Sequence, residues 1–553
     1  MRPNQILGST LSPIIALAMG GALLFAGTGQ VAAASTLTVC PSGCAYPEIG
    51  PALSAAHDGD TIRIGAGTYA GGITINVSVK LIGAGAGKTV IKGGGPVVTI
   101  GAYAALTQPT VSISGVTVTG GVSHSSLLSS DWFGAEGIAA TGGGIEILPK
   151  AKANGDFVGG AKVTITDSVV TGNLVAPTRT ISAGFPCPDG HDCTFAWAKG
   201  GGIDTWGALT LVNTTVNHNT AAGVASDADG GGISVWWTGQ LTLAGSRVTG
   251  NRATAVAPNG RWAEGGGIFT DGGIVLKVSG SLISDNTASL TSKLPYLVPG
   301  ADPLDMSANG GGIHVGDAST EVITGTTLRN NLVSVDDPNG EPYAFDSAAT
   351  NPSGGSLVLR DSTITNNRVV AHVGSSADVG PSGTALDING PATVSNVRIT
   401  GNTASVTSIS GNAGAAAAGV YAGNTSSKPI VISNTVISGN TSTASSKHGS
   451  ATVFGAGLLN DGGLLVIRDS VLTANVGIAN GHSGTAQGGG IWNSNLYNQS
   501  AAQLTLDGTT VSRNSLIGSA GITIQGGGLF TVAPVTLHGS HITHNQPDDC
   551  SGC

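Results

Sequence analysis

Charged and aromatic side chains are scarce in this chain of 553 residues. Asp, Glu, Lys and Arg together make up 10% of the sequence, and Phe, Trp and Tyr make up 4%. Acidic residues outnumber basic ones, the formal net charge is −9, and no basic stripe is present that could neutralise phosphates. The composition therefore argues against a nucleic-acid partner and requires a core built from aliphatic side chains.

Long apolar runs are also missing beyond the N-terminus. Arg2 precedes the run PIIALAMGGALLFAG, and VAAAS follows it, with small residues at Ala32 and Ala34. This pattern predicts a secretory signal over residues 1–34, cleaved after Ala34. A membrane anchor is the alternative, but the run is shorter than the roughly 20 residues that a span needs. We expect a secreted, extracellular protein, released or loosely held at the cell surface, with no membrane span after the signal is removed.

The six cysteines form three local pairs, which are Cys40/Cys44, Cys187/Cys193 and Cys550/Cys553. An even number of cysteines in an exported chain predicts disulfides. A shared metal site is disfavoured because the pairs lie far apart in the sequence. A redox role for the last pair is disfavoured because no βαβ pattern surrounds it.

Glycine is abundant, with 89 residues, and much of it belongs to a repeat. The motif S/T-x-[VIL]-x-x-N recurs at intervals of 31 to 46 residues, with looser first positions in some copies. Its copies end at Asn173, Asn219, Asn251, Asn286, Asn331, Asn367, Asn402, Asn440, Asn475, Asn514 and Asn545. Such a period indicates a solenoid rather than a set of separate domains.

Fixed columns precede each of these asparagines. An aliphatic residue stands three positions earlier, and only Asp, Asn or Gly stands six positions earlier. Residues of the second kind tolerate a left-handed backbone, so this column predicts a tight turn between two strands. Alternating aliphatic residues before the turn predict a half-buried strand. The asparagines are expected to form an inward ladder of amides from coil to coil.

Glycine runs supply the remaining element of each repeat. They read GGGI or GGGL at Gly142, Gly200, Gly230, Gly265, Gly310, Gly488 and Gly526, with looser forms at Gly354, Gly383, Ala417 and Gly455. The pattern predicts three short strands per repeat, each repeat being one coil of an all-β fold. We expect a single-stranded right-handed parallel β-helix over residues 59–545.

The two ends are expected to differ from the repeats. Ile49, Leu53 and Ala56 share one face of a predicted short helix, which makes residues 35–58 an N-terminal cap. A cap of this kind prevents the first coil from exposing strand edges. Residues 546–553 are expected to form a C-terminal tail with its cysteine pair.

The segments GDTIRIGAGTY and ITINVSVKLIGAGAGKTVI, followed by the GGGI…N repeats, resemble secreted bacterial right-handed parallel β-helix proteins of the pectin-lyase-like superfamily. The repeats are also similar, more weakly, to those of polymorphic outer-membrane proteins. The resemblance covers nearly all of residues 36–553. It implies the fold, and it leaves the activity open, because the superfamily includes polysaccharide lyases, glycoside hydrolases, adhesins and other surface proteins.

The strand after each glycine run is the face on which enzymes of that superfamily hold a glycan. The residue after the repeat's Ile or Leu is expected to point outward. This column contains Glu146, Asp204, Ser234, Phe269, His314, Val358, Asp387, Tyr421, Leu459, Trp492 and Phe530. Trp206 and Trp236 lie near the same face. The residues Trp206, Trp236, Phe269, His314, Tyr421 and Trp492 are therefore candidates for stacking on sugar rings, although scattered surface aromatics are common.

Glu146 and Asp204 are the candidate catalytic residues. They belong to consecutive coils, and their carboxyl groups are expected to lie roughly 5 Å apart, the separation found in retaining glycosidases. The alternative is a solvated acidic edge. The Asn-Thr-Asp, Gly-His-Gly and Arg-Ile-Lys motifs of polygalacturonases are absent, and so is the Asp cluster of pectate lyases.

No cofactor is required by the sequence. Asp227 and Asp229 in the segment SDADGGG could hold calcium, but a polar glycine-rich turn is the favoured interpretation. His538, His541 and His544 are expected to be split between strand faces rather than to bind zinc.

The leading functional hypothesis is a monomeric, non-catalytic protein that binds an extracellular polysaccharide or cell-surface component along the glycine-side face. A polysaccharide lyase or glycoside hydrolase is the alternative, and a structural or adhesive surface protein is a third.

Overall fold

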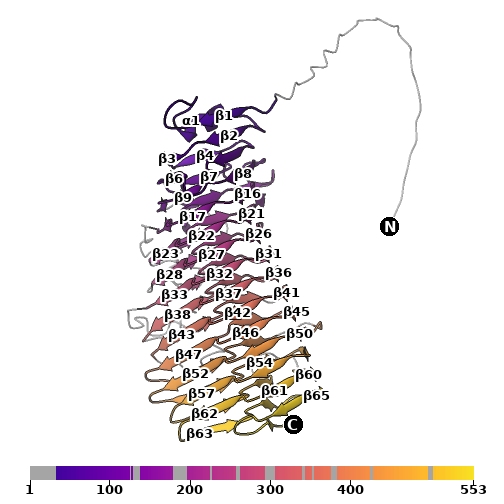
Figure 1. The fold of residues 1–553 in the computed structure, drawn as a ribbon. Coiled ribbons are helices and arrows are strands. Elements are labelled where there is room, and N and C mark those ends of the chain that lie inside the picture. The colour runs from indigo at the N-terminus through magenta and orange to yellow at the C-terminus, as the bar shows by residue number, and fades with distance from the viewer. Residues whose placement is uncertain are drawn as a thin grey trace, which may run out of the picture.

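The computed structural model describes residues 33–124, 126–128, 137–177, 196–224, 227–256, 262–292, 306–338, 343–351, 354–374, 383–423, 427–495 and 502–553. Within these residues the chain winds into one rod of stacked coils. The rod runs from α1 and β1 at the N-terminal end to β63 and β65 at the other end (Figure 1). The fold is an all-β parallel β-helix, as the sequence predicts.

A complete coil of the central rod contains five strands. One such coil consists of β20 (Ile203–Thr205), β21 (Ala208–Val212), β22 (Thr215–Asn217), β23 (Thr220–Val224) and β24 (Asp227–Asp229). The prediction of three strands per repeat is therefore wrong. The two additional strands lie between the asparagine and the next glycine run, as β23 and β24 do between Asn219 and Gly230.

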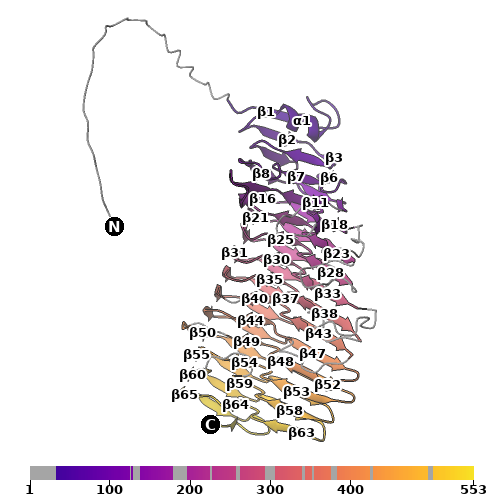
Figure 2. The same cartoon turned by 180° about the vertical axis from the view of Figure 1, so that it is seen from behind.

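Like strands of successive coils pair in parallel and build five sheets. Sheet 1 runs from β1 (Thr36–Val39) to β65 (Val535–His538), sheet 2 from β3 (Gly67–Ala70) to β66 (His541–Thr543), and sheet 3 from β10 (Val122–Ser123) to β62 (Ser515–Gly518). Sheets 4 and 5 hold the strands before and after the glycine runs. Both sheets are interrupted once along the described part of the rod. Figure 2 shows strands of sheets 4 and 5 on the side of the rod turned away in Figure 1.

The strands of sheet 4 are β11 (Ser126–Leu128), β12 (Gly137–Thr141), β19 (Ala196–Lys199), β24, β29 (Trp262–Glu264), β34 (Ser307–Asn309) and β39 (Tyr343–Phe345), followed after the break by β48 (Ala413–Ala416), β53 (Ser450–Phe454), β58 (Ser483–Gln487) and β63 (Ile522–Gln525).

The strands of sheet 5 are β4 (Ile73–Ile75), β7 (Val98–Ile100), β13 (Ile145–Ile147), β20, β25 (Ile233–Val235), β30 (Ile268–Thr270) and β35 (Ile313–Val315), followed after the break by β40 (Ala349–Asn351), β44 (Leu386–Ile388), β49 (Val420–Ala422), β54 (Leu458–Asp461), β59 (Ile491–Ser494), β64 (Leu529–Thr531) and β67 (Cys550–Ser551).

Two separate hydrophobic cores fill the rod. The larger core contains inward side chains of sheets 1, 2 and 5, such as Leu209, Val216 and Ile203. The smaller core contains side chains of sheets 3 and 4, such as Ala221 and Ala228, and consists mainly of Ala and Val. The two cores are separated along a line that we call the waist.

The waist is where the repeated asparagines meet the glycine runs. Asn219 Nδ2 donates to Asn251 Oδ1 (3.0 Å) and to the Val170 carbonyl (3.0 Å), and the Asn219 amide also donates to Asn251 Oδ1 (3.0 Å). The predicted ladder is confirmed from Asn173 to Asn545, where the Asp549 carboxylate accepts the last two bonds. It satisfies amide groups that are buried at this corner of each coil.

Glycine is required at the waist because the ladder leaves no space for a side chain. A Cβ on Gly202 would lie 2.6 Å from the Gly232 carbonyl oxygen and 2.8 Å from Asn219 Nδ2. The first glycine of the run has a different requirement, since Gly200 has a φ of 67°. The predicted left-handed turn column is also confirmed, with φ near 50° even at its Asp and Asn members, such as Asp167 and Asn213.

The predicted N-terminal capping helix is present as α1 (Ile49–Ala55), which buries Ile49, Ala52 and Leu53. It contacts β1, β2 (Thr61–Ile64) and β4. Because β1 pairs in register with β2, sheet 1 begins before the helix, and α1 is inserted between its first two strands.

Two of the three predicted disulfides are present, Cys40–Cys44 and Cys550–Cys553. Cys187 and Cys193 lie outside the described residues, and so do residues 1–32 of the signal predicted over residues 1–34. In the described ranges, no helix has the length and apolar character needed to cross a membrane.

Candidate functional site

The first glycine of each run bends the chain sharply between sheets 4 and 5. A Cβ on Gly310 would lie 2.4 Å from His314 Cβ, and one on Gly142 would lie 2.7 Å from Glu146 Cβ. The residue before the run and the residue four positions after the first glycine therefore face each other across the bend. Thr141 Oγ1 donates to Glu146 Oε1 across it (2.7 Å). We call this lengthwise concave corner of the rod the corner cleft.

Two rows of side chains line the corner cleft, one residue per coil. The sheet 4 row is Thr141, Lys199, Asp229, Glu264, Asn309 and Phe345, paired in register. The sheet 5 row is Glu146, Asp204, Ser234, Phe269 and His314, also in register. The second row is the column that the sequence predicts, and the first row was not predicted.

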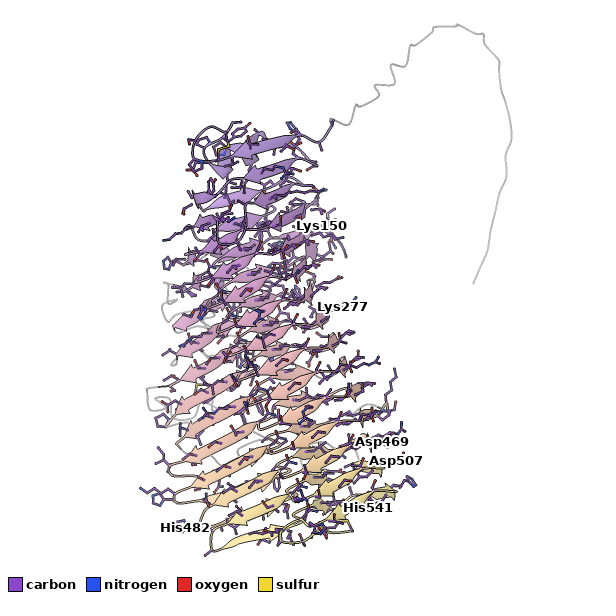
Figure 3. All side chains as sticks on the ribbon, viewed as in Figure 1. Lys150, Lys277, Asp469, His482, Asp507 and His541 are labelled. Carbon is purple, nitrogen blue, oxygen red and sulfur yellow. A yellow bond between two sulfur atoms is a disulfide. The ribbon has the colours of Figure 1, made fainter. Side chains whose placement is uncertain are left out.

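The predicted site residues point away from the main core, but the expectation that they are exposed is wrong for most of them. The relative exposure is 1% for Asp204, 7% for Trp206, 6% for Phe269, 8% for Tyr421 and 2% for Trp492. Glu146, Trp236 and His314 are half-buried. The physical reason is the bend, which brings the two rows into contact so that they cover each other. By contrast, charged side chains elsewhere on the rod, such as Lys277, Asp507 and His541, project into solvent (Figure 3).

The two tryptophans form an internal stack rather than an open platform. The Trp206 and Trp236 rings lie 4.2 Å apart and nearly parallel. Trp236 Nε1 donates to both carboxylate oxygens of Asp204, at 3.0 Å each. Trp236 therefore covers the Asp204 carboxyl group, and its partner in the stack, Trp206, is itself held by Phe157 at 5.0 Å.

The candidate catalytic pair occupies adjacent register positions, as predicted. Burial raises the pKa of Asp204 to about 8, with a further contribution from Glu146, while the bond from Trp236 opposes the shift. Burial also raises the pKa of Glu146, against a smaller lowering by Thr141. Asp204 is thus protonated at neutral pH, but its two oxygens are occupied and enclosed. A role for this pair in catalysis remains a prediction.

Further along the corner cleft lies a cavity of about 170 Å³, lined by Phe345, Asp346, Thr384, Asp387, Asn389 and Tyr421. Thr384 Oγ1 donates to Asp346 Oδ1 (2.7 Å), and Asn389 Nδ2 donates to Asp387 Oδ1 (2.8 Å). The Phe345 ring stacks on Tyr343 with centroids 5.7 Å apart. The cavity thus combines two carboxyl groups, an amide, two hydroxyl groups and an aromatic wall.

Asp346 was missed because the sequence analysis placed the glycine run of this coil at Gly354. In the structure Val358 belongs to β41 (Ser356–Arg360) of sheet 1, and the segment Asp346–Ala348 takes the place of the glycine run. Asp346 has a φ of 56°, the conformation that glycine adopts in most coils. The number of residues between Asn331 and the next strand could have indicated this segment, but the two glycines at Gly354 resemble a glycine run and led to the wrong assignment.

The two carboxyl groups of the cavity interact with each other. Burial raises the pKa of Asp346 to about 7, and the bond from Thr384 limits the shift. Burial also raises the pKa of Asp387, and Asp346 raises it further. An acid that keeps a proton near neutral pH beside a second carboxyl group can donate a hydrogen bond or a proton to a bound ligand.

Beyond the cavity, aromatic side chains fill the corner cleft. Tyr421 donates its hydroxyl proton to Asp461 Oδ2 (3.0 Å), and Trp492 Nε1 donates to Gln487 Oε1 (3.3 Å). The Trp492 ring packs near Phe454 and Phe530. Tyr421 therefore borders the cavity, whereas Trp492 is a packed residue in this structure.

The described residues contain no group of three or more His, Cys, Asp or Glu side chains placed to hold a metal ion. Asp229 instead pairs with Lys199 at 3.2 Å, and Asp227 Oδ1 accepts the Trp262 amide at 3.1 Å. Calcium binding at Asp227 and Asp229 remains a prediction that nothing here supports.

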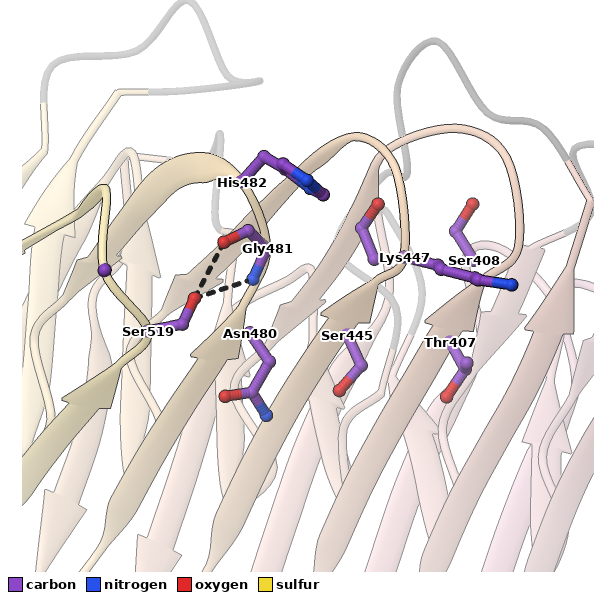
Figure 4. Close-up of a pocket in the computed structure, with 10 residues that line it drawn as sticks. Thr407, Ser408, Ser445, Lys447, Asn480, Gly481, His482 and Ser519 are labelled. Atoms are coloured by element: carbon purple, nitrogen blue, oxygen red, sulfur yellow. Dashed lines mark hydrogen bonds between the residues drawn. The ribbon is translucent and has the colours of Figure 1, made fainter.

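A second, more open groove of about 520 Å³ lies on the turns between sheets 3 and 4 (Figure 4). Its lining includes the hydroxyl groups of Thr407, Ser445 and Ser519, together with Lys447 and His482. Ser519 Oγ donates to the Gly481 carbonyl (2.7 Å) and accepts the Gly481 amide (3.0 Å). Its described lining has no Phe, Tyr or Trp side chain, so we place the candidate site in the corner cleft.

Comparison with known proteins identifies no family for this chain. No protein-family model matches it, and no curated protein matches its sequence. Among solved structures, it is similar to the Azotobacter vinelandii mannuronan C-5 epimerase AlgE6 A-module. The two share 11% sequence identity over 90% of this chain and 94% of that one, with a TM-score of 0.31. The fold therefore rests on the strand pairing described above, and the function must be argued from the corner cleft.

Proposed function

We propose that this protein binds an extracellular polysaccharide along the corner cleft, with one sugar unit in the cavity between Asp346 and Asp387. The observation that supports this most strongly is the composition of the cavity. Sugar hydroxyl groups both donate and accept hydrogen bonds, and carboxyl, amide and hydroxyl groups can satisfy both needs. The apolar face of a sugar ring packs on an aromatic ring, which Phe345 supplies.

The position of Asp346 adds to the argument. A non-glycine residue with positive φ costs conformational energy, and Asp is one of the few residues that tolerate it. A carboxyl group therefore replaces glycine in the coil where the cavity is found.

Binding can be tested by affinity electrophoresis and co-sedimentation with a panel of neutral, acidic and amino-sugar polysaccharides. We expect at least tenfold weaker binding for Phe345→Ala and Asp387→Asn. Tyr103→Ala is the matched control, because Tyr103 is 51% exposed and does not line the cavity. Equal binding by all three variants, or no binding to any polysaccharide by the wild-type protein, would overturn the proposal.

A second candidate function is cleavage of the bound polysaccharide, favoured by the raised pKa of Asp346 beside the carboxyl group of Asp387. Such a pair has the features of a general acid and its partner carboxylate. Mass spectrometry of products would show unsaturated ends for a lyase and saturated ends for a hydrolase. Activity that survives in both Asp346→Asn and Asp387→Asn would exclude this pair, and binding without products would leave the protein a binding rod.

A further inference from the structure

A lysine, an aspartate and a glutamate occupy one row of the corner cleft in three successive coils. Lys199 is in register with Asp229, and Asp229 with Glu264. Lys199 Nζ lies 3.2 Å from Asp229 Oδ2, and each of these two side chains is 7% exposed. Neighbouring strands of a parallel sheet are about 4.8 Å apart, so this proximity is imposed by the backbone and not by side-chain mobility.

The surroundings of the pair are apolar on one side. Lys199 Nζ lies 4.2 Å from the centre of the Trp236 ring and 4.7 Å from that of Phe269. Asp229 Oδ1 is buried and has no hydrogen-bond partner within the described residues. A buried ion pair with one unsatisfied oxygen is an expensive arrangement, because desolvation of both charges is only partly offset by their attraction.

We propose that Lys199 and Asp229 condense to form an intramolecular amide cross-link between two coils. Nζ of Lys199 attacks Cγ of Asp229, a new C–N bond forms, and the bond from Cγ to one carboxyl oxygen breaks. That oxygen leaves as water. An ammonium group and a carboxylate together contain the atoms and protons of one amide and one water molecule, so no oxidant, reductant or other reagent is needed.

The proton on Lys199 must move before the attack, and the Asp229 carboxyl group, 3.2 Å from Nζ, is placed to accept it. Burial by itself lowers the pKa of Lys199, but Asp271, Asp229 and Asp204 together raise it, so the amine is seldom neutral. Burial raises the pKa of Asp229 and brings that of Glu264 to about 7. The Asp229 carboxyl group can therefore hold the proton taken from the ammonium group, and the departing oxygen leaves as water with this proton and a second one from Nζ.

The fold supplies the driving force that a free lysine and aspartate lack. Fixed neighbours react with effective concentrations on the order of 10⁵ M or more, and exclusion of water disfavours the reverse hydrolysis. The reaction is expected to be slow and to occur once, after the coils have stacked. Asp271 is a competing acceptor, but it is farther from Nζ (3.8 Å) and its side chain is more exposed, at 26%.

The test is to purify the protein in its folded state, then to denature and reduce it and digest it with trypsin. Between Lys199 and Arg247 the sequence has no other lysine or arginine. Without the cross-link, trypsin cuts after Lys199 and yields a peptide Gly200–Arg247. With it, Lys199 is resistant, and a single peptide from Thr180 to Arg247 appears, lighter than its sequence by one water molecule.

Lys199→Arg should restore both the cut and the full mass, whereas Asp271→Asn should keep the cross-link. Asp229→Ala should also restore the cut and the full mass, while circular dichroism shows the fold retained. The proposal is overturned if the wild-type peptide has its full mass, or if Lys199 is joined to the peptide that contains Asp271. The mass of the wild-type peptide decides whether the cross-link exists, and this measurement does not depend on whether any variant folds.

Discussion

Replacing one asparagine of the waist ladder, Asn286→Ala, should destabilise the rod far more than most single substitutions. The Asn286 side chain is fully buried. Its Oδ1 accepts two bonds from Asn251, from the amide and from Nδ2, both at 3.0 Å. Its Nδ2 donates to the Val248 carbonyl at 2.9 Å and to Asn331 Oδ1 at 3.0 Å.

The magnitude follows from the groups that the substitution leaves unpaired. Two N–H groups of Asn251 and the Val248 carbonyl lose these partners, and Asn331 Oδ1 keeps only the Asn286 amide (3.2 Å). A buried polar group without a partner costs about 1–3 kcal/mol, so the loss should be roughly 3–8 kcal/mol. Alanine also leaves a cavity too enclosed to relax fully.

The neighbouring substitution Asn330→Gly is the matched control. Asn330 is exposed, its side chain donates only to the exposed Asp285 carboxylate, and its φ of 55° suits glycine. We expect a change within about 1 kcal/mol. Urea denaturation followed by tryptophan fluorescence gives the overall loss. Since coils of a solenoid can unfold separately, hydrogen exchange at the Asn251 amide gives the local effect. The reasoning is refuted if Asn286→Ala resembles Asn330→Gly in both measurements.

Two further predictions concern the waist and the corner cleft. Gly232→Ala should lower the free energy of unfolding by several kcal/mol in thermal denaturation, because a Cβ there would lie 2.5 Å from the Gly267 carbonyl oxygen. At Gly280 a Cβ would meet no atom within 4 Å, so Gly280→Ala should cost only about 1 kcal/mol of backbone strain. The pKa of Asp204 rises from 3.8 to about 8 on folding, so the folded state holds the proton more tightly than the unfolded state. The contribution of Asp204 to the free energy of unfolding is therefore complete below about pH 4 and is lost as the pH rises to about 8. Asp204→Asn should flatten this fall in melting temperature, and a wild-type stability that increases from pH 5 to pH 8 would contradict the assignment.

Local rules explain why so much of the fold could be predicted from the sequence. A column limited to Asp, Asn and Gly reports a left-handed backbone, whatever its neighbours are, and Asp167 and Asn213 adopt it. The invariant asparagine and the glycine run occur at constant places in each repeat, because each coil presents the same corner to the next. Periodicity therefore revealed the parallel β-helix, its amide ladder and its capping helix.

The five-strand coil was harder to predict because the strands of sheets 3 and 4 have a core of small residues. Segments such as Thr220–Val224 carry Ala and Gly at inward positions, and they lack the alternation of large aliphatic side chains that marks a strand. Length variation between coils then made these strands look like loops. These segments have a weak sequence preference for strand, and they form sheets because they stack against one another.

The corner cleft was decided by tertiary structure alone. Residues before and after a glycine run face each other because the first glycine has positive φ. The predicted sheet 5 row therefore contacts the sheet 4 row, which was not predicted, and is buried by it. Lys199 and Asp229 meet only because coils of different length keep register. Asp346 joins Asp387 because an aspartate accepts the backbone conformation of a glycine. The sequence by itself determined the rod and its repeated corner, and packing between coils determined which side chains meet there, because those contacts depend on register across dozens of residues.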